Sequence, residues 1–244
     1  MARPRRVRNV LEFGANRVLS TLGYELRDRR LNERPEGFPG YLEAAQRLGM
    51  DVNDFEEQNL GWRLPRPTLD DIVFPYLTED SIVCEIGPGT GRWSRHIVPQ
   101  LPRGELHLVD ASPWMVRFLR NYFRLLPNVS AHLSNGQSLP FERAGWMDLV
   151  FSANSLVELK LGVIYHYALD FARVLKPGGY AVVDYIDPTT PEGWDHLRTQ
   201  GVEMSTVYTF HAPEVIDRVL MNAGFAIERR YQVGKSTFVI ARRA

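Results

Sequence analysis

The segment Val83-Cys-Glu-Ile-Gly-Pro-Gly-Thr-Gly91 constrains the fold of this chain more than any other feature. An apolar run that contains one acidic residue, Glu85, leads into three glycines at alternate positions. Glycine is needed where the backbone turns sharply or a ligand approaches it closely. A dinucleotide fingerprint would place its third glycine at position 92, which is Arg92, and a phosphate loop would continue with Lys and Ser or Thr. We therefore expect a buried strand, a ligand-binding turn of another kind, and a helix that begins near Arg92.

Apolar runs alternate with helical patterns through the rest of the chain. We expect strands at 81–86, 105–110, 129–133, 148–152 and 180–185, with a final pair at 225–232 and 236–242. Helices are expected at 41–48 and 115–123, between the fourth and fifth strands as far as residue 175, and at 213–223. This alternation predicts an α/β fold with a largely parallel sheet and helices on both faces. Such sheets bind ligands at the carboxyl ends of their strands.

The second expected strand ends in Asp110, which lies 19 residues after Gly91. A carboxylate at about this distance, at the tip of the next strand, can accept hydrogen bonds from both ribose hydroxyls of a nucleoside. The alternative is that Asp110 caps the following helix. Ser112 can take that capping role, so the motif favours the ribose interpretation.

Five motifs, taken in order and spacing, resemble those of class I S-adenosylmethionine-dependent methyltransferases: Glu85-Ile-Gly-Pro-Gly-Thr-Gly91, Val109-Asp-Ala-Ser-Pro-Trp-Met115, Asn135-Gly-Gln-Ser-Leu-Pro-Phe141, Asp148-Leu-Val-Phe-Ser152 and Val174-Leu-Lys-Pro-Gly-Gly179. The resemblance covers residues 66–244, which we expect to form the S-adenosylmethionine-binding domain. It implies a doubly wound, mostly parallel seven-stranded sheet whose last strand is antiparallel. Residues 1–65 are expected to form a helical, basic N-terminal extension or lid.

The resemblance also implies roles for individual residues around S-adenosylmethionine. The loop from Gly87 to Gly91 lies under the methionine part, and Asp110 holds the ribose diol. Trp114 or Met115 packs on the adenine. Asn135 stands where the family usually has Asp, and its amide oxygen can accept from the adenine amine, with Gly136 and Gln137 as near alternatives. Glu85 organises the loop or steadies the sulfonium. The expected cofactor-binding set is Glu85, Gly87, Gly89, Gly91, Asp110, Trp114, Met115, Asn135, Gly136 and Ser152.

Methyl transfer requires an acceptor aligned with the methyl group, and an alcohol acceptor usually needs a base as well. Glu158, six residues after the fourth strand, is the first candidate base, with a surface pair to Lys160 as the alternative. Further candidates are His166 on the next helix, Tyr185 at the end of the fifth strand, and His211. The alternative is that these side chains are simply packed or exposed to solvent. Residues 187–212 form either a substrate lid or a packed connector.

Composition narrows the classes of partner. The formal net charge is zero, which gives no general case for nucleic acid, although residues 1–34 hold nine arginines against four acidic residues. That basic start allows weak peripheral membrane contact, while Trp62 and Arg63 are candidates to close over the methionine carboxylate or to pack on the core. The single cysteine, Cys84, is expected in the core and suits a reducing, cytoplasmic compartment. The histidines lack metal-ligand spacing, so no metal is expected.

The leading functional hypothesis is O-methylation of a small molecule or a glycan intermediate. One alternative is methylation of a carboxylate, phosphate or amine. Others are a catalytically silent S-adenosylmethionine-binding regulatory or scaffold protein, and a nucleotide-dependent oxidoreductase, against which Arg92 argues. The sequence does not indicate an oligomeric state.

Overall fold

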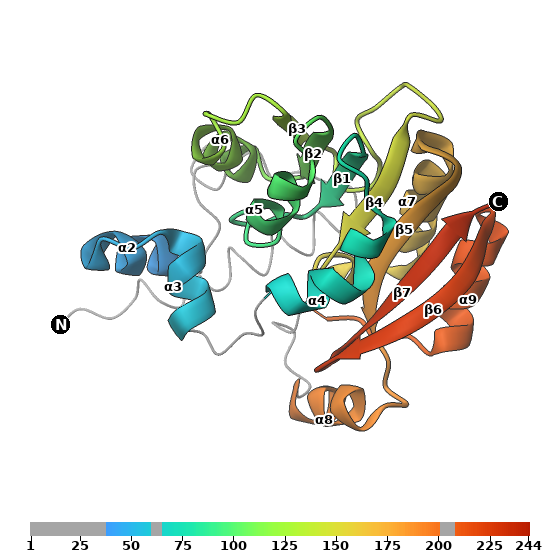
Figure 1. Ribbon diagram of the computed structural model, residues 1–244. Coiled ribbons are helices and arrows are strands. Elements are labelled where there is room, and N and C mark those ends of the chain that lie inside the picture. The colour runs from blue at the N-terminus through green and yellow to red at the C-terminus, as the bar shows by residue number, and fades with distance from the viewer. Residues whose placement is uncertain (1–37, 60–64, 201–207) are drawn as a thin grey trace.

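The computed structural model describes residues 38–59, 65–200 and 208–244 (Figure 1). The basic start of the expected N-terminal extension, and Trp62 with Arg63, lie outside these ranges. Two helices precede the sheet domain, α2 (Phe38–Leu48) and α3 (Val52–Asn59). The first of them begins at Phe38, three residues before the helix expected from residue 41.

The centre of the molecule is a seven-stranded sheet with the order β3-β2-β1-β4-β5-β7-β6. Its strands are β1 (Ile82–Ile86), β2 (Glu105–Asp110), β3 (Val129–Leu133), β4 (Met147–Ser152), β5 (Leu175–Ile186), β6 (Phe225–Val233) and β7 (Ser236–Arg243). The first five run parallel, and β7 is antiparallel to both β5 and β6. The predicted seven-stranded, mostly parallel sheet with an antiparallel last strand is therefore confirmed.

The fifth strand is longer than its sequence predicts. Lys176-Pro-Gly-Gly179 was expected to separate a helix from a strand beginning at Tyr180, but β5 already starts at Leu175. Gly178 adopts φ 81°, and the pairing with β4 shifts register between Met147 and Leu149. A glycine at positive φ lets a strand continue through such an irregularity, so these residues join the sheet.

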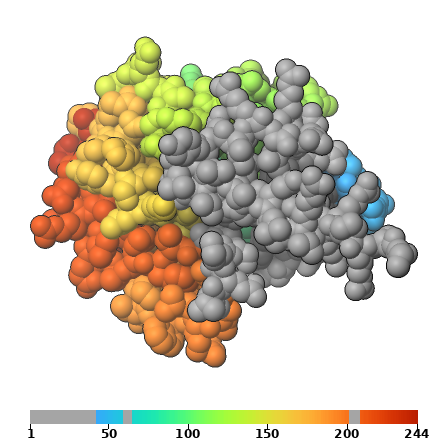
Figure 2. Space-filling model, turned by 180° about the vertical axis from the view of Figure 1, so that it is seen from behind, coloured from blue at the N-terminus to red at the C-terminus, as the bar shows by residue number. Residues whose placement is uncertain are grey.

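Helices cover both faces of the sheet (Figure 1). One face packs against α4 (Pro65–Ile72), α5 (Ser94–Ile97) and α6 (Pro113–Tyr122) through a cluster that includes Leu69, Ile97 and Leu119. The other face packs against α7 (Leu161–Val174) and α9 (Pro213–Asn222) through a cluster that includes Phe171 and Leu220. Seen from behind, α7 and α9 form adjoining parts of the surface (Figure 2). Strands buried on both faces explain why their sequences are nearly continuous apolar runs.

Two smaller features complete the architecture. Cys84 is fully buried in β1, as predicted for a core thiol. The segment between β5 and α9 contains a helix that the sequence did not predict, α8 (Pro191–Gln200). Across the described ranges, every helix is too short or too polar to cross a lipid bilayer.

Candidate functional site

The glycine loop follows the carboxyl end of β1, and each of its glycines has a positive φ: 63° at Gly87, 56° at Gly89 and 84° at Gly91. A Cβ on Gly87 would lie 2.0 Å from Ser155 Oγ, and one on Gly91 would lie 2.8 Å from the Phe123 ring. A Cβ on Gly89 would meet nothing within 4 Å. Gly87 and Gly91 are therefore required by packing, whereas Gly89 faces open space where a ligand can approach the backbone.

Glu85 lies behind this loop and not in it. Its side chain is 1% exposed, and its Oε2 accepts a hydrogen bond of 2.6 Å from Ser94 Oγ at the start of α5. Burial raises the pKa of Glu85 to about 7, against the opposing effect of the Ser94 bond. The carboxyl group thus joins the end of β1 to the start of α5 through the Ser94 side chain.

The helix α3 contacts the same loop through a buried side chain. Asn53, which is fully buried, donates from Nδ2 to the Thr90 carbonyl oxygen over 3.1 Å. Arg95 of α5 pairs with Asp54 and Glu57 at 2.6 and 2.9 Å. Glu56, buried on the same helix, has a pKa raised mainly by burial. Residues before the sheet domain therefore complete the wall around the glycine loop.

Asp110 ends β2 one strand away from the glycine loop. Its Oδ1 accepts from the Ser112 backbone N–H at 2.8 Å, while Ser112 Oγ accepts from Met115 N and caps α6. The capping alternative for Asp110 is therefore excluded. Burial raises the pKa of Asp110 to about 6, opposed by the backbone hydrogen bonds of Ser112 and Ala111. A partly desolvated carboxylate of this kind is a strong acceptor for a ligand hydroxyl.

The residues expected around an adenine take different positions. Met115 lines the cavity described below, whereas Trp114 stacks on Phe118 with ring centroids 5.6 Å apart. Asn135 Oδ1 already accepts from Gln137 N, Ser138 N and Ser138 Oγ at 2.9 to 3.1 Å. Three donors thus already contact the oxygen that was expected to accept from an adenine amine, and that role of Asn135 stays a prediction. Gly136, at φ 75°, shapes the same turn.

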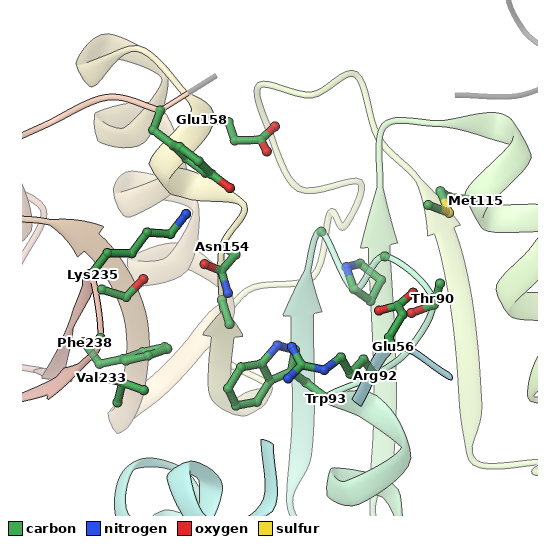
Figure 3. Close-up of a pocket in the computed structure, with 17 residues that line it drawn as sticks. Glu56, Thr90, Arg92, Trp93, Met115, Asn154, Glu158, Val233, Lys235 and Phe238 are labelled. Carbon is green, nitrogen blue, oxygen red and sulfur yellow. The ribbon is translucent and has the colours of Figure 1, made fainter. Parts of the chain in front are cut away.

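A cavity of about 450 Å³ opens beside the glycine loop (Figure 3). Its lining comes from two groups of elements that face each other across the cavity. One group belongs to the glycine loop, α3 and α6, and contributes Glu56, Gly87, Pro88, Gly89, Thr90, Arg92, Trp93 and Met115. The other belongs to the segments after β4 and α8 and to the β6–β7 turn, and contributes Ala153, Asn154, Glu158, Tyr208, Val233, Gly234, Lys235, Ser236 and Phe238.

Asn154 is the most unusual residue of the second group. It is the single non-glycine residue with positive φ, 57°, in the described part of the chain. Asp184 of β5 accepts from Asn154 N at 2.9 Å with one oxygen and from Ser236 Oγ at 2.8 Å with the other. Burial raises the pKa of Asp184 to about 6. One buried carboxyl group therefore fixes both the segment after β4 and the β6–β7 turn.

Of the four predicted catalytic candidates, the structure brings one to the cavity. Glu158 lines it from the short 3-10 helix η3 (Leu156–Glu158). His166 is exposed on α7, away from the lining. Tyr185 is 2% exposed and packs in the core between the sheet and helices α7 and α9. His211 donates its backbone N–H to Ile186 O and also lies outside the lining.

Tyr185 does not line the cavity because side chains alternate along a strand, and its side chain points to the face covered by α7 and α9. Ser152 is likewise absent from the lining. It is fully buried at the end of β4, and its hydroxyl donates to the Ile86 carbonyl oxygen over 3.2 Å. Its side chain joins β1 to β4.

Several lining residues were not singled out from the sequence as site residues. Asn154 had a signal, since asparagine is the usual non-glycine residue in the left-handed region. Lys235 follows Gly234 in a hairpin turn, which had no chemical signal of its own. Glu56 and Trp93 reach the cavity only through tertiary packing. Within the described residues, no group of three or more His, Cys, Asp or Glu side chains converges as a metal site.

Residues 83–179 match the family model of a methyltransferase domain. A methyltransferase-like protein of Schizosaccharomyces pombe is 29% identical over 140 residues, 53% of this chain and 50% of that protein. The demethylmenaquinone methyltransferase of Tropheryma whipplei is 34% identical over 109 residues, 44% of this chain and 42% of that protein. The chain thus spans half or less of the length of these curated relatives.

The fold is shared with solved structures. The crystal structure of a SAM-dependent methyltransferase from Aquifex aeolicus superposes with a TM-score of 0.61 at 19% identity, covering 86% of this chain and all of that one. At this low identity the superposition shows a shared fold, and the acceptor must be inferred from the residues of this chain.

Proposed function

We propose that this chain, which belongs to the class I S-adenosylmethionine-dependent methyltransferase family, transfers the methyl group of S-adenosylmethionine to an oxygen atom of a small molecule or glycan intermediate. One observation carries the proposal: a single open cavity joins the glycine loop to a polar end that contains Glu158, Asn154 and Lys235. An open cavity beside the cofactor loop favours an active enzyme over a catalytically silent binding protein, because a scaffold does not need space for an acceptor.

The residues present fit S-adenosylmethionine. The open space at Gly89 accommodates the methionine part, and Met115 links this cavity to the end of β2, where Asp110 would hold the ribose. Glu56 and Arg92 offer opposite charges to the amino and carboxylate groups. When bound, S-adenosylmethionine supplies a methyl group on a positively charged sulfur. The chain contributes binding, alignment and exclusion of water.

The acceptor would occupy the end of the cavity opposite the glycine loop. Glu158 is placed there to receive the proton of a hydroxyl acceptor. Apolar side chains of Val233, Phe238 and Trp93 border the space and reduce competition from water. The alternative is a carboxylate, phosphate or amine acceptor. An ionised carboxylate or phosphate, or a neutral amine, can attack the methyl group without first giving a proton to Glu158.

The proposed function is tested by incubating the full chain with methyl-labelled S-adenosylmethionine and pools of hydroxylated aromatics, sugars, carboxylic acids and amines. We expect release of S-adenosylhomocysteine and labelled product from a hydroxylated pool. Binding of S-adenosylmethionine without transfer to any pool would favour a silent binding protein. NADH binding, followed by its fluorescence, in place of S-adenosylmethionine binding would contradict the proposal.

Replacing Asp110 with alanine is expected to weaken S-adenosylmethionine binding by about 1.5–3 kcal/mol at pH 8, because a charge-assisted acceptor is lost. The pKa of Asp110 is raised to about 6, so its charge is present above pH 6 and is lost as the pH falls through 6. The ratio of the two dissociation constants should therefore shrink between pH 8 and pH 5. Calorimetry that finds equal affinities at pH 8, with both chains folded, would refute the ribose assignment.

A further inference from the structure

Lys235 is brought to the cavity by the antiparallel end of the sheet. It lies in the turn between β6 and β7, where Gly234 adopts φ 57°. The first residue of β7, Ser236, pairs with Ile186 at the carboxyl end of β5. Because β7 runs opposite to the parallel strands, its beginning lies at the edge where their carboxyl ends meet. The turn therefore carries a lysine to the ligand-binding edge of the sheet.

The ammonium group of Lys235 lies over an aromatic ring. Its Nζ lies 3.4 Å from the centroid of the Tyr208 ring. In the described part of the chain, Lys235 makes no ion pair within 4.0 Å. A π face attracts the positive charge but has no lone pair for the three N–H donors. The group thus retains donors for an oxygen in the cavity, toward which it points in Figure 3.

Among the described residues, the ionisable groups near Lys235 are Asp184, His196 and Glu158. Asp184 and His196 are close enough for the charge of Lys235 to lower the pKa of each, although for both residues burial has the largest effect. Glu158 lines the same end of the cavity from another element. Because the two oxygens of Asp184 are used by Asn154 and Ser236, that carboxyl group positions the turn and does not neutralise the lysine through a direct contact.

The walls beside Lys235 are apolar and largely aromatic. Tyr208, Trp93, Phe238 and Val233 line the same cavity. Trp93 and Phe238 lie edge to face, with ring centroids 6.4 Å apart. A cation at the end of an aromatic pocket suits a ring that carries an acidic oxygen, because the ring is desolvated by the walls while the oxygen pairs with the charge.

We infer that Lys235 binds the acceptor oxygen in its anionic form, so that the acceptor is a ring-bearing small molecule with an acidic hydroxyl group. This inference rests on the proposed function. The hydroxyl proton passes to Glu158, and Lys235 donates to the oxyanion that remains. That oxygen then forms the O–CH₃ bond while the S–CH₃ bond breaks, with its electron pair staying on sulfur. The products are a neutral ether and S-adenosylhomocysteine.

The probe for this inference is 4-nitrophenol, whose ionised form has its own absorbance band. It is titrated into the full chain loaded with S-adenosylhomocysteine, in parallel with 4-nitroanisole, which has the same ring with the oxygen methylated. We expect the pKa of the bound phenol to lie about 1 below that of the free phenol, because an opposite charge adjoins it. We also expect the phenolate to bind more tightly than the methyl ether.

Lys235→Met should weaken phenolate binding about 10- to 100-fold and abolish the lowered pKa of the bound phenol, while Lys235→Arg should restore much of both. Lys176→Met serves as the matched control. Lys176 pairs with Asp148 at the amino end of β5, at the opposite edge of the sheet from the cavity, and its loss should leave both readings unchanged.

Affinity for S-adenosylhomocysteine distinguishes a failure of the inference about Lys235 from a failure of the proposed function. If wild type binds S-adenosylhomocysteine but holds phenolate and methyl ether equally, or if Lys235→Met binds phenolate as wild type does, the inference about Lys235 is overturned and the proposed function stands. If wild type fails to bind S-adenosylhomocysteine, the proposed function itself fails.

Discussion

Gly89→Val is expected to abolish measurable binding of S-adenosylmethionine, a loss of at least about 100-fold. The added side chain would enter the space beside the loop, where no described residue other than the chain neighbours of Gly89 has an atom within 4 Å of the new Cβ. It would block the approach of the methionine part to the loop backbone. Calorimetry with S-adenosylmethionine and with S-adenosylhomocysteine measures the effect.

A matched variant separates this blockage from backbone strain. Gly145 has φ 62° and equally open surroundings, but it lies in an exposed turn before β4, at the opposite edge of the sheet. Gly145→Val therefore introduces the same left-handed strain without entering the cavity, and should bind the cofactor as wild type does. Normal binding by a folded Gly89→Val chain would mean that the loop does not cradle the cofactor.

Glu158→Gln is expected to lower kcat by about 10²–10⁴ while leaving affinity for S-adenosylmethionine nearly unchanged. Glutamine keeps the size of the side chain but cannot receive the acceptor proton. The measurement is steady-state turnover with the acceptor found by the pooled screen, together with calorimetry for the cofactor. Glu142→Gln, an exposed position outside the cavity lining, is the control.

Near-full turnover by Glu158→Gln would remove this residue from the mechanism. It would also move the acceptor from an alcohol or phenol to a group that is already ionised, for which no base is needed. Since His166, Tyr185 and His211 all lie outside the cavity lining, the remaining polar candidates at this end of the cavity would be Asn154, Tyr208, Lys235 and Ser236.

Much of the fold could be predicted from the sequence because the central strands β1, β2 and β4 are buried on both faces and read as apolar runs, while the outer strands are short β-prone segments between turns. The runs at 105–110 and 129–133 coincide with β2 and β3, and the expected helix at 213–223 with α9 to within one residue. The start of β5 and the helix α8 could not be predicted in this way. Lys176-Pro-Gly-Gly179 has local signals for a helix end and turn, but β4 pairs with the residues on either side of it, Leu175 and Tyr180, so that β5 runs through this segment.

The candidate site, like the fold, could be predicted from the sequence only in part. The glycine loop and Asp110 are contiguous motifs, so their place at the carboxyl ends of β1 and β2 follows from local sequence. The acceptor end is assembled from three distant segments, which Asp184 and the pairing of β5 with β7 bring together. Neither Lys235 nor Asn154 belongs to a local motif that predicts this meeting.

The most direct test of the central claim is a crystal structure of the full chain with S-adenosylhomocysteine. We expect the sulfur to lie between the Gly87–Gly89 backbone and the end of the cavity lined by Glu158 and Lys235. We also expect the ribose hydroxyls to lie within hydrogen-bond distance of the Asp110 carboxylate. A bound molecule whose sulfur faces away from Glu158 and Lys235, or whose ribose lies far from Asp110, would contradict it.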